Sequence, residues 1–138
     1  MTAPDTRLLI AGERVGGDGP ALAVENPATQ ETIASIGTPS GEQLDAAIST
    51  AHEAVPGWAA TPAIERGEML HEVARRLRER SEELALLMTA EGGKPLVENS
   101  DEIEWTAAAF DYYAEIGRNF AGRVIPSIEA TQLSLVIK

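Results

Sequence analysis

Cysteine is absent from the 138-residue sequence, and basic residues are scarce. Without cysteine the chain can form no disulfide bond, thiolate metal site or cysteine nucleophile of its own. The 11 Lys and Arg residues face 22 Asp and Glu residues, which gives a formal net charge of −11. Nucleic-acid binding requires clustered basic side chains that displace counterions from phosphates, so no nucleic-acid partner is expected.

Long apolar runs are missing as well. No stretch approaches the ~20 apolar residues that a membrane-spanning helix needs. The first residues, Met1–Asp5, lack the basic segment and apolar core of a signal peptide. We therefore expect no membrane partner and a cytoplasmic location. The two histidines, His52 and His71, have no partner at the spacing of metal ligands, and both are expected to be surface or boundary residues.

Strand signals stand at the front of the chain, in four short segments: Leu8–Ile10, Glu13–Val15, Leu22–Val24 and Glu31–Ile36. The first two flank Ala11-Gly12, where glycine can take the positive φ of a tight hairpin turn. The other two flank Asn26-Pro27-Ala28-Thr29, and an asparagine before proline favours an extended or turn conformation. The sequence therefore predicts an opening hairpin followed by further short strands.

Two helices are predicted in the middle of the chain. Ser40 can cap the first, with Gln43 as its partner in a capping box, and Pro56-Gly57 is expected to end it. The second is predicted to begin with Thr61 as its cap and Pro62 at the first helical position, where a missing N–H costs nothing.

Two more helices are predicted further on. One begins near Ser81 and ends at Gly92-Gly93, where glycine supplies a left-handed C-terminal residue. The other begins at Pro95 and is stopped by Gly122. One face of this last helix has apolar or small residues at helical spacing: Ile103, Ala107, Phe110, Ala114 and Gly117. The repeat covers barely two heptads and contains Ala and Gly, which argues against a dimeric coiled coil.

The end of the chain has a different pattern. Leu133, Leu135 and Ile137 alternate with neighbouring residues, a period of two that predicts a strand. This strand is expected to lack a partner within the chain. Its unpaired edge would then need another segment to pair with.

Three polar segments can be compared with known kinds of site. Gly92-Gly93-Lys94 lacks the upstream glycine and the following Ser or Thr of a phosphate-binding loop, so Lys94 is interpreted as a surface cation. Glu98 and Glu102 share a helix face, as an acid–base pair could, but without a nucleophile or metal ligand they are interpreted as solvated charge. The basic run 75–80 is interleaved with glutamates, which is typical of a solvated helix face.

Two motifs together point to a known family. The segment Glu91-Gly92-Gly93-Lys94-Pro95-Leu96 is followed by Asp101-Glu102-Ile103 and then by Phe110-Asp111-Tyr112-Tyr113-Ala114. This combination resembles the N-terminal region of NAD(P)-dependent aldehyde dehydrogenases. The opening hairpin and the Asn-Pro-Ala-Thr turn extend the resemblance to nearly the whole chain.

The resemblance implies the front portion of an α/β enzyme, with a short β-hairpin and strands, about four helices and a terminal strand. Residues 1–128 would be the N-terminal part of the cofactor-binding domain, and residues 129–138 would start the hairpin that joins subunits. This fold would be incomplete without the remainder of the dehydrogenase. The complete enzyme implied by the family oxidises an aldehyde to a carboxylic acid with NAD or NADP and is expected to be a homo-oligomer.

The resemblance assigns no catalytic and no cofactor-binding residue to this chain. The family's nucleophilic cysteine, oxyanion asparagine, activating glutamate and Gly-rich cofactor turn have no counterpart before Lys138. Trp105 matches a helix position that lines the aldehyde tunnel in relatives, with packing under the helix as the alternative. The backbone carbonyls near Val24 and at Glu91 match a structural monovalent-cation site, although Glu91 replaces the commoner aspartate.

Two other hypotheses stay open on the sequence. The first is a non-catalytic interaction module derived from the same fold, which would bind a partner through its helices and its last strand. The second is an unrelated acidic helical protein whose motifs match by accident.

Overall fold

The computed structural model describes residues 5–119 and 121–136, so Met1–Pro4 and the Ile137 end of the predicted last strand lie outside the described residues. The elements follow one another as β1 (Leu8–Ile10), β2 (Glu13–Val15), β3 (Ala21–Glu25), β4 (Thr32–Gly37), α1 (Gly41–Ala60), α2 (Ala63–Glu79), α3 (Ser81–Gly92), α4 (Leu96–Asn119), β5 (Arg123–Ile125) and β6 (Ser134–Val136). The predicted strands and helices are thus all present, with shifted ends.

The opening hairpin is built as its turn residues predict. Strands β1 and β2 are antiparallel, with Leu8 opposite Val15 and Ile10 opposite Glu13. Both turn residues have positive φ, 54° at Ala11 and 82° at Gly12. Two successive positive φ values characterise the hairpin turn whose twist matches that of the strands. Ala11 therefore also adopts the left-handed conformation that was expected only of the glycine.

The second hairpin turns at Asn26. Its side-chain oxygen accepts hydrogen bonds from the backbone N–H groups of Ala28 at 2.9 Å and Thr29 at 3.3 Å, so the asparagine organises the turn as its sequence position predicts. Strands β3 and β4 pair antiparallel, with a shift of register between Val24 and Glu25. Such a bulge leaves one residue of the strand without a regular ladder partner.

Helix α1 begins as predicted but ends later. The Ser40 hydroxyl oxygen accepts from the Gln43 backbone N–H at 3.2 Å, and the Gln43 side chain accepts from the Ser40 N–H at 3.0 Å. The prediction that Pro56 ends the helix is wrong, because α1 continues through it to Ala60. Proline removes only one helical hydrogen bond, and on this exposed helix water can satisfy the carbonyl that is left.

Thr61 closes α1 and does not cap α2, which corrects the predicted start of the second helix. Its backbone N–H and its hydroxyl both donate to the Gly57 carbonyl, at 3.1 and 3.0 Å. With the hydroxyl used in this way, α2 begins at Ala63 without a side-chain cap, and Pro62 stands just before its first residue. Thr61 thus satisfies a free carbonyl at the end of one helix.

The junction of α3 and α4 agrees closely with the sequence. Gly93 ends α3 with a left-handed φ of 73°. A Cβ at this glycine would lie 2.7 Å from Cγ of Pro27, so the turn of the second hairpin packs against the end of α3. Helix α4 follows Pro95, but it ends at Asn119 and not at Gly122. The Asn119 side chain donates to the Glu115 carbonyl at 2.9 Å, which satisfies an end carbonyl early.

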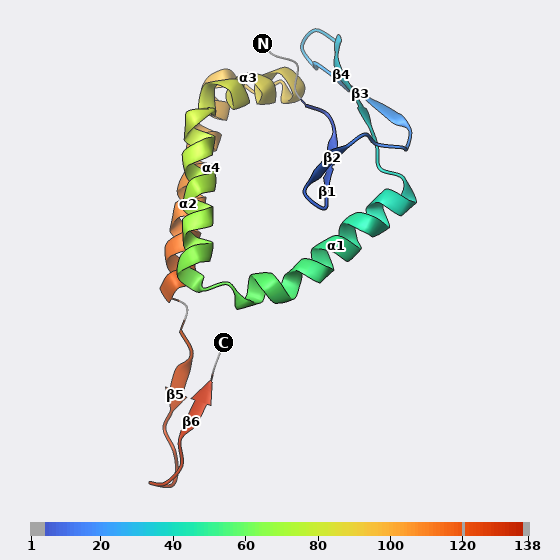
Figure 1. Cartoon of the computed structure of the whole chain (residues 1–138). Coiled ribbons are helices and arrows are strands. Elements are labelled where there is room, and N and C mark those ends of the chain that lie inside the picture. The colour runs from blue at the N-terminus through green and yellow to red at the C-terminus, as the bar shows by residue number, and fades with distance from the viewer. Residues whose placement is uncertain (1–4, 120, 137–138) are drawn as a thin grey trace.

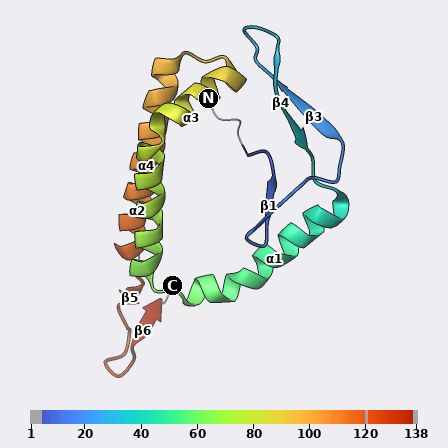
Figure 2. The ribbon, with the colours of Figure 1, turned by 45° about the horizontal axis from the view of Figure 1, so that its top comes forward.

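Helices α2 and α4 run antiparallel, side by side, and form the body of the molecule (Figures 1 and 2). The apolar side chains buried among the described residues belong to α2, α3 and α4: Ala74, Ala85, Ile103, Ala107 and Ala114. Most are alanines, which let the helix backbones approach closely. The predicted face of α4 is confirmed at Ile103, Ala107 and Ala114, which are buried, and in part at Phe110, which is half-buried. Gly117 is exposed, whereas the next residue, Arg118, lies against Gly67 of α2.

The rest of the chain is open. Helix α1 and the two front hairpins lie on one side of the molecule, away from the α2–α4 pair (Figures 1 and 2). The chain exposes 10313 Å² of surface, whereas a compact monomer of its mass, 14.7 kDa, exposes about 6,900 Å². Much apolar surface that a compact domain would bury is therefore accessible in this chain.

The last strand has a partner, which corrects the expected unpaired edge. Strands β5 and β6 are antiparallel, with Val124 opposite Leu135. The hairpin thus begins at Arg123, before the predicted boundary at residue 129, and projects beyond the end of the α2–α4 pair (Figure 1). The sequence pattern revealed β6 through its alternation. The matching segment Arg123–Ile125 is too short to show such a pattern.

Candidate functional site

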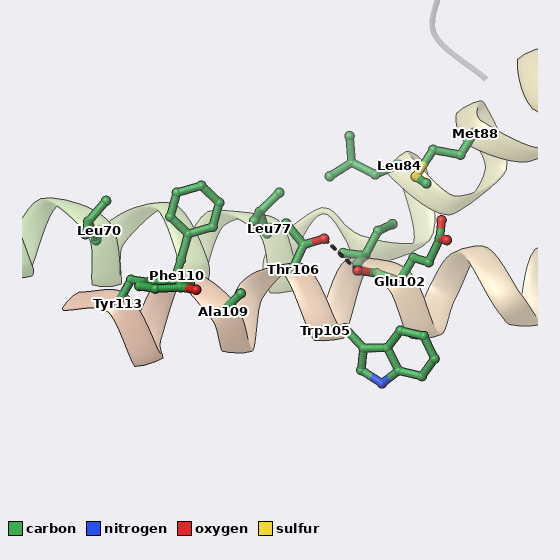
Figure 3. A pocket seen from close by; sticks show the side chains of 11 residues that line it. Leu70, Leu77, Leu84, Met88, Glu102, Trp105, Thr106, Ala109, Phe110 and Tyr113 are labelled. Atoms are coloured by element: carbon green, nitrogen blue, oxygen red, sulfur yellow. Dashed lines mark hydrogen bonds between the residues drawn. The ribbon is translucent and has the colours of Figure 1, made fainter. Parts of the chain in front are cut away.

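An apolar groove lies along the α2–α4 pair and reaches α3. Its volume is about 680 Å³, and it is lined mainly by aliphatic and aromatic side chains, among them Leu70 and Leu77 of α2, Leu84 and Met88 of α3, and Phe110 and Trp105 of α4. Figure 3 shows these side chains along α2 and α4 and on the adjoining α3. Ligand and partner surfaces are typically apolar concavities of this kind, so the groove is the main candidate for a binding surface.

Trp105 stands at the margin of this groove. Its side chain is 69% exposed, and the indole points away from α2 (Figure 3). Packing of Trp105 under its helix, the alternative to a tunnel position, is therefore not found in this chain. An indole this exposed on an otherwise well-packed helix is available to another surface. Its place in an aldehyde tunnel stays a prediction.

The Gly-Gly-Lys-Pro segment is a structural junction. Lys94 Nζ lies 2.7 Å from Glu102 Oε1 and 3.9 Å from Glu98 Oε2. Both carboxylates of the candidate acid–base pair thus face a lysine, which agrees with their interpretation as charged groups without catalytic partners. The arrangement ties the start of α4 to the loop before it.

Asn99 is a buried polar residue that the sequence analysis missed. It is 1% exposed, and its side-chain nitrogen donates to the Thr89 hydroxyl at 2.8 Å and to the Lys94 carbonyl at 3.2 Å. A buried amide needs such partners, because leaving a buried polar group unsatisfied costs about 1–3 kcal/mol. The position of Asn99, one helical turn after the helix-starting Pro95, was the sequence signal that could have indicated this role.

His71 also has partners that sequence spacing could not reveal. Its ring faces Asp111 and Glu115 of α4, and Asp111 is 40 residues away in the chain. Hydrogen bonds to Asp111 and then to Glu115 raise the pKa of His71. In turn, His71 and Arg78 lower the pKa of Asp111. His71 is half-buried at the seam between the helices, which agrees with the boundary position expected for it, but its two carboxylate partners were not predicted.

The basic run on α2 forms exposed ion pairs, as predicted. Arg75 Nη2 lies 2.6 Å from Glu72 Oε1, and Arg76 Nε lies 2.6 Å from the same oxygen. Hydrogen bonds from Arg75 and Arg76 lower the pKa of Glu72 to about 2. Arg78 pairs with Glu104 and Asp111 of α4, and Arg80 pairs with Glu83 of α3. Because carboxylates neutralise the charges of this run, they offer no positive stripe to a phosphate backbone.

The two carbonyls proposed for a monovalent cation lie in suitable backbone settings. Glu91 is in the last turn of α3, where helix geometry leaves carbonyls without helical partners and where a cation is favoured by the helix dipole. Val24 is paired with Ala34 beside the register shift of the β3–β4 hairpin, where Ile33 of β4 has no partner, and the turn after β3 packs on Gly93 through Pro27. The monovalent-cation site at Val24 and Glu91 stays a prediction.

Side chains give no further metal site in the part of the chain that the structure describes. Over residues 5–119 and 121–136, no group of three His, Cys, Asp or Glu side chains is placed to hold a metal ion. Among the helices of the same residues, none combines the length and the apolar character required to cross a membrane.

Solved structures with this arrangement define the class of the protein. An NAD-dependent benzaldehyde dehydrogenase from Corynebacterium glutamicum superposes with a TM-score of 0.86 and 28% identity, over 96% of this chain and 29% of that one. An aldehyde dehydrogenase from Brucella melitensis superposes with a TM-score of 0.91 and 31% identity, over 96% and 28%. The fold is therefore the N-terminal portion of an α/β oxidoreductase.

Sequence comparison identifies the family. Residues 15–138 match the Aldehyde dehydrogenase family, and the chain belongs to this family. It is 37% identical over 131 residues to the NADP(+)-dependent succinate-semialdehyde dehydrogenase of Escherichia coli, covering 94% of this chain and 27% of that protein. It is 38% identical over 134 residues to the lactaldehyde dehydrogenase of the same organism, covering 95% and 28%. The chain thus spans about a quarter of the length of these relatives.

Proposed function

We propose that this chain is the N-terminal segment or subunit of an aldehyde dehydrogenase that oxidises an aldehyde to a carboxylic acid, with its catalytic residues outside the chain. The observation that carries the proposal is the open apolar surface of the α2–α4 pair. A groove of about 680 Å³ with leucine, methionine and aromatic walls suits coverage by more of the same enzyme. Membership of the family supports the reaction, because its relatives are named for aldehyde oxidation.

The cofactor of the complete enzyme is NAD or NADP. Relatives support both, since one solved neighbour is named NAD-dependent and the E. coli relative is named for NADP(+). When bound, NAD or NADP would supply the hydride acceptor for oxidation of the aldehyde. This chain would contribute the scaffold on which the later cofactor-binding and catalytic regions pack. The cytoplasmic location stays a prediction.

Three sites within the chain are proposed for the assembled enzyme. Trp105 would line the aldehyde tunnel, since its indole is exposed beside the groove. Val24 and Glu91 would hold a structural monovalent cation through their backbone carbonyls and so link the second hairpin to α3. Residues 1–128, apart from β5, would belong to the cofactor-binding domain. The hairpin of β5 and β6 would join subunits of a homo-oligomer.

An activity assay tests the main proposal. The purified chain alone should give no aldehyde-dependent reduction of NAD or NADP, because it has no cysteine and the covalent route requires a thiolate nucleophile. Activity should appear when the chain is co-expressed with a chain that supplies the later regions. Cofactor reduction by the purified chain alone, free of contaminating enzyme, would overturn the proposal.

The hairpin offers a matched pair of variants for the same assay. Leu135→Asp places a charge at the centre of β6, opposite Val124, and should weaken the rescue of activity. Thr131→Asp, in the exposed turn between β5 and β6, should leave the rescue intact. Equal rescue by both variants would argue against a role of the hairpin in assembly.

Trp105→Ala tests the tunnel proposal in the assembled enzyme. Because Trp105 is 69% exposed, its truncation should leave the melting temperature within a few degrees while it changes KM and the preference for aldehyde chain length. Thermal stability and kinetics on a series of aldehydes measure both effects. A large loss of stability with unchanged substrate preference would assign Trp105 to packing.

The alternative of a non-catalytic module derived from the fold predicts a different result. The intact mass of the natural gene product would then correspond to a chain without a catalytic region. Light scattering of the isolated 138 residues would also show a monomer with a cooperative melt. The aldehyde dehydrogenase proposal predicts oligomers or aggregates instead, because the groove and other apolar surface are exposed.

A further inference from the structure

Both ring nitrogens of His71 face carboxylate oxygens of α4. Nδ1 lies 2.6 Å from Asp111 Oδ1, and Nε2 lies 3.0 Å from Glu115 Oε1. A neutral imidazole has one N–H and can donate to only one of these groups, whereas an imidazolium donates to both. An ionised carboxylate only accepts. The two short contacts together therefore require the cationic form of His71 while both carboxylates are ionised.

Neighbouring cations keep the two carboxylates ionised. Arg78 of α2 donates from Nη1 to Asp111 Oδ2 at 2.7 Å, so both oxygens of Asp111 face donors. Arg118 of α4 lies 3.4 Å from Glu115 Oε1 and also faces Glu68 of α2 at 3.8 Å. Hydrogen bonds from His71, then from Arg78, lower the pKa of Asp111. The hydrogen bond from His71 likewise lowers the pKa of Glu115.

We propose that His71 is a proton-dependent clasp between α2 and α4, which holds both carboxylates of α4 while the ring is cationic and releases one when the ring loses a proton. The groups that act on it within the described residues come from both helices: Asp111, Glu115 and Arg118 of α4, and Glu68 and Arg78 of α2. The proposal concerns this chain's own helices and does not depend on the assigned enzyme activity.

The clasp closes the edge of the helix pair opposite the groove. At about 100° per residue, Asp111 and Glu115 lie across α4 from the groove residues Thr106 and Tyr113. Deprotonation of His71 thus loosens the polar edge of the pair without changing the apolar lining. A change at the clasp can therefore be measured apart from a change in the groove.

The direction of the pH dependence follows from the shifts. The pKa of His71 is raised above its ordinary 6.5. The contribution of cationic His71 to the stability of the fold is therefore fully present below pH 6.5 and is lost as the pH rises through the raised pKa. The pKa values of Asp111 and Glu115 are lowered from 3.8 and 4.5, so their stabilisation is present above those values and is lost on acidification. The clasp is fully formed between about pH 4.5 and 6.5.

The protonation state of His71 can be measured by diethyl pyrocarbonate, which acylates only the neutral ring. The rate at His71 is followed against pH by peptide mass spectrometry, in the folded 138-residue chain and in the same chain in urea. The method works in oligomers and resolves His71 from His52. We expect the folded midpoint to lie above the urea midpoint. A folded midpoint equal to or below the urea midpoint would overturn the proposal.

Variants separate charge from accessibility. Asp111→Asn and Glu115→Gln should each lower the midpoint of His71 toward its value in urea, whereas a change in accessibility alone alters the plateau rate and leaves the midpoint in place. Glu98→Gln removes the same charge from α4 several turns away and should leave the midpoint unchanged. An unchanged midpoint in both clasp variants would refute the role of the two carboxylates.

A stability measurement tests the clasp itself. His71→Asn keeps a hydrogen-bonding side chain, although a smaller one, but cannot become cationic. Its denaturation midpoint should fall furthest below that of the unmodified chain at pH 6 and should approach it as the pH rises through the raised pKa of His71. A difference that is the same at all pH values would show that His71 acts only by packing, and the clasp would be refuted.

Discussion

Helices α1 and α4 are similar in length, at 20 and 24 residues, but they are held in different ways. None of the residues of α1, all of which the structure describes, is buried, whereas α4 buries Asn99, Ile103, Ala107 and Ala114. The start of α1 is defined by the Ser40 capping box, and Gln43 also donates to the Gly16 carbonyl at 2.8 Å. Local hydrogen bonds thus define one helix, and packing against α2 defines the other.

The comparison shows what each kind of interaction contributes to stability. A good N-cap is worth about 1 kcal/mol, while a fully buried aliphatic side chain is worth about 1.5–3 kcal/mol. Helix α1 should therefore be the less stable of the two in the isolated chain. Its exposed apolar residues, such as Leu44 and Ile48, would need another surface to bury them.

The largest effect is expected for Ile103→Ala. Ile103 is 4% exposed at the centre of the helical body, and truncation of a buried aliphatic side chain costs about 2–5 kcal/mol. Chemical denaturation followed by circular dichroism, at one protein concentration, measures the loss. Val97→Ala, on the same helix but 68% exposed, should change stability by no more than about 0.5 kcal/mol. Equal losses of stability in the two variants would contradict the conclusion that packing against α2 defines α4.

A smaller loss is expected for Ala107→Leu. Ala107 is fully buried, and added methylene groups in a close-packed contact cost about 1–3 kcal/mol. Ala108→Leu is the control, because the neighbouring side chain is exposed. The same denaturation assay applies. If Ala107→Leu stabilised the chain, the close contact of α4 with its neighbours would have to be looser than described.

Ser40→Ala should cost about 1 kcal/mol, the usual value of an N-cap serine. The loss should appear as faster hydrogen exchange in the first turns of α1, with little change in α4. Ser49→Ala, within the same helix and exposed, should be neutral or slightly stabilising because alanine is the better helix former. Faster exchange in α4 as well would mean that the two helices are coupled and do not differ as proposed.

The smallest effect is expected at the exposed ion pairs of α2. Arg75 and Arg76 lower the pKa of Glu72 from 4.5 to about 2, so the stabilisation is present above pH 4.5 and is lost as the pH falls toward 2. Glu72→Gln should give a small loss at neutral pH that salt reduces. Glu53→Gln, on α1, makes the same change of net charge. If both variants responded equally to pH and salt, only net charge would be involved.

Local sequence was enough to predict many features of the fold. The Ser40 capping box, the Ala11-Gly12 turn and the left-handed Gly93 were all found from residues a few positions apart, because each depends on nearby backbone geometry. The predicted helix end at Pro56 and the predicted N-cap at Thr61 were wrong for a related reason. Each residue has more than one favourable local role, and the surrounding chain selects between them.

The polar contacts of the candidate region could be predicted only in part. The pairing of Lys94 with Glu102 spans a single helix junction, and the motif that contains it was visible. The contacts of His71 with Asp111 and of Asn99 with Thr89 depend on how helices lie against one another. No spacing rule within one helix contains that information.

The sequence by itself determined the order and type of the elements, the absence of a cysteine nucleophile and, through its motifs, the aldehyde dehydrogenase family. These properties depend on residue identity and on local backbone preferences. Tertiary structure alone decided which charges meet at the clasp, that Trp105 is exposed beside an apolar groove, and that Arg123–Ile125 pairs with the last strand. Such contacts join residues far apart in the chain, and they form only when the packing of whole helices and strands brings them within a few ångströms.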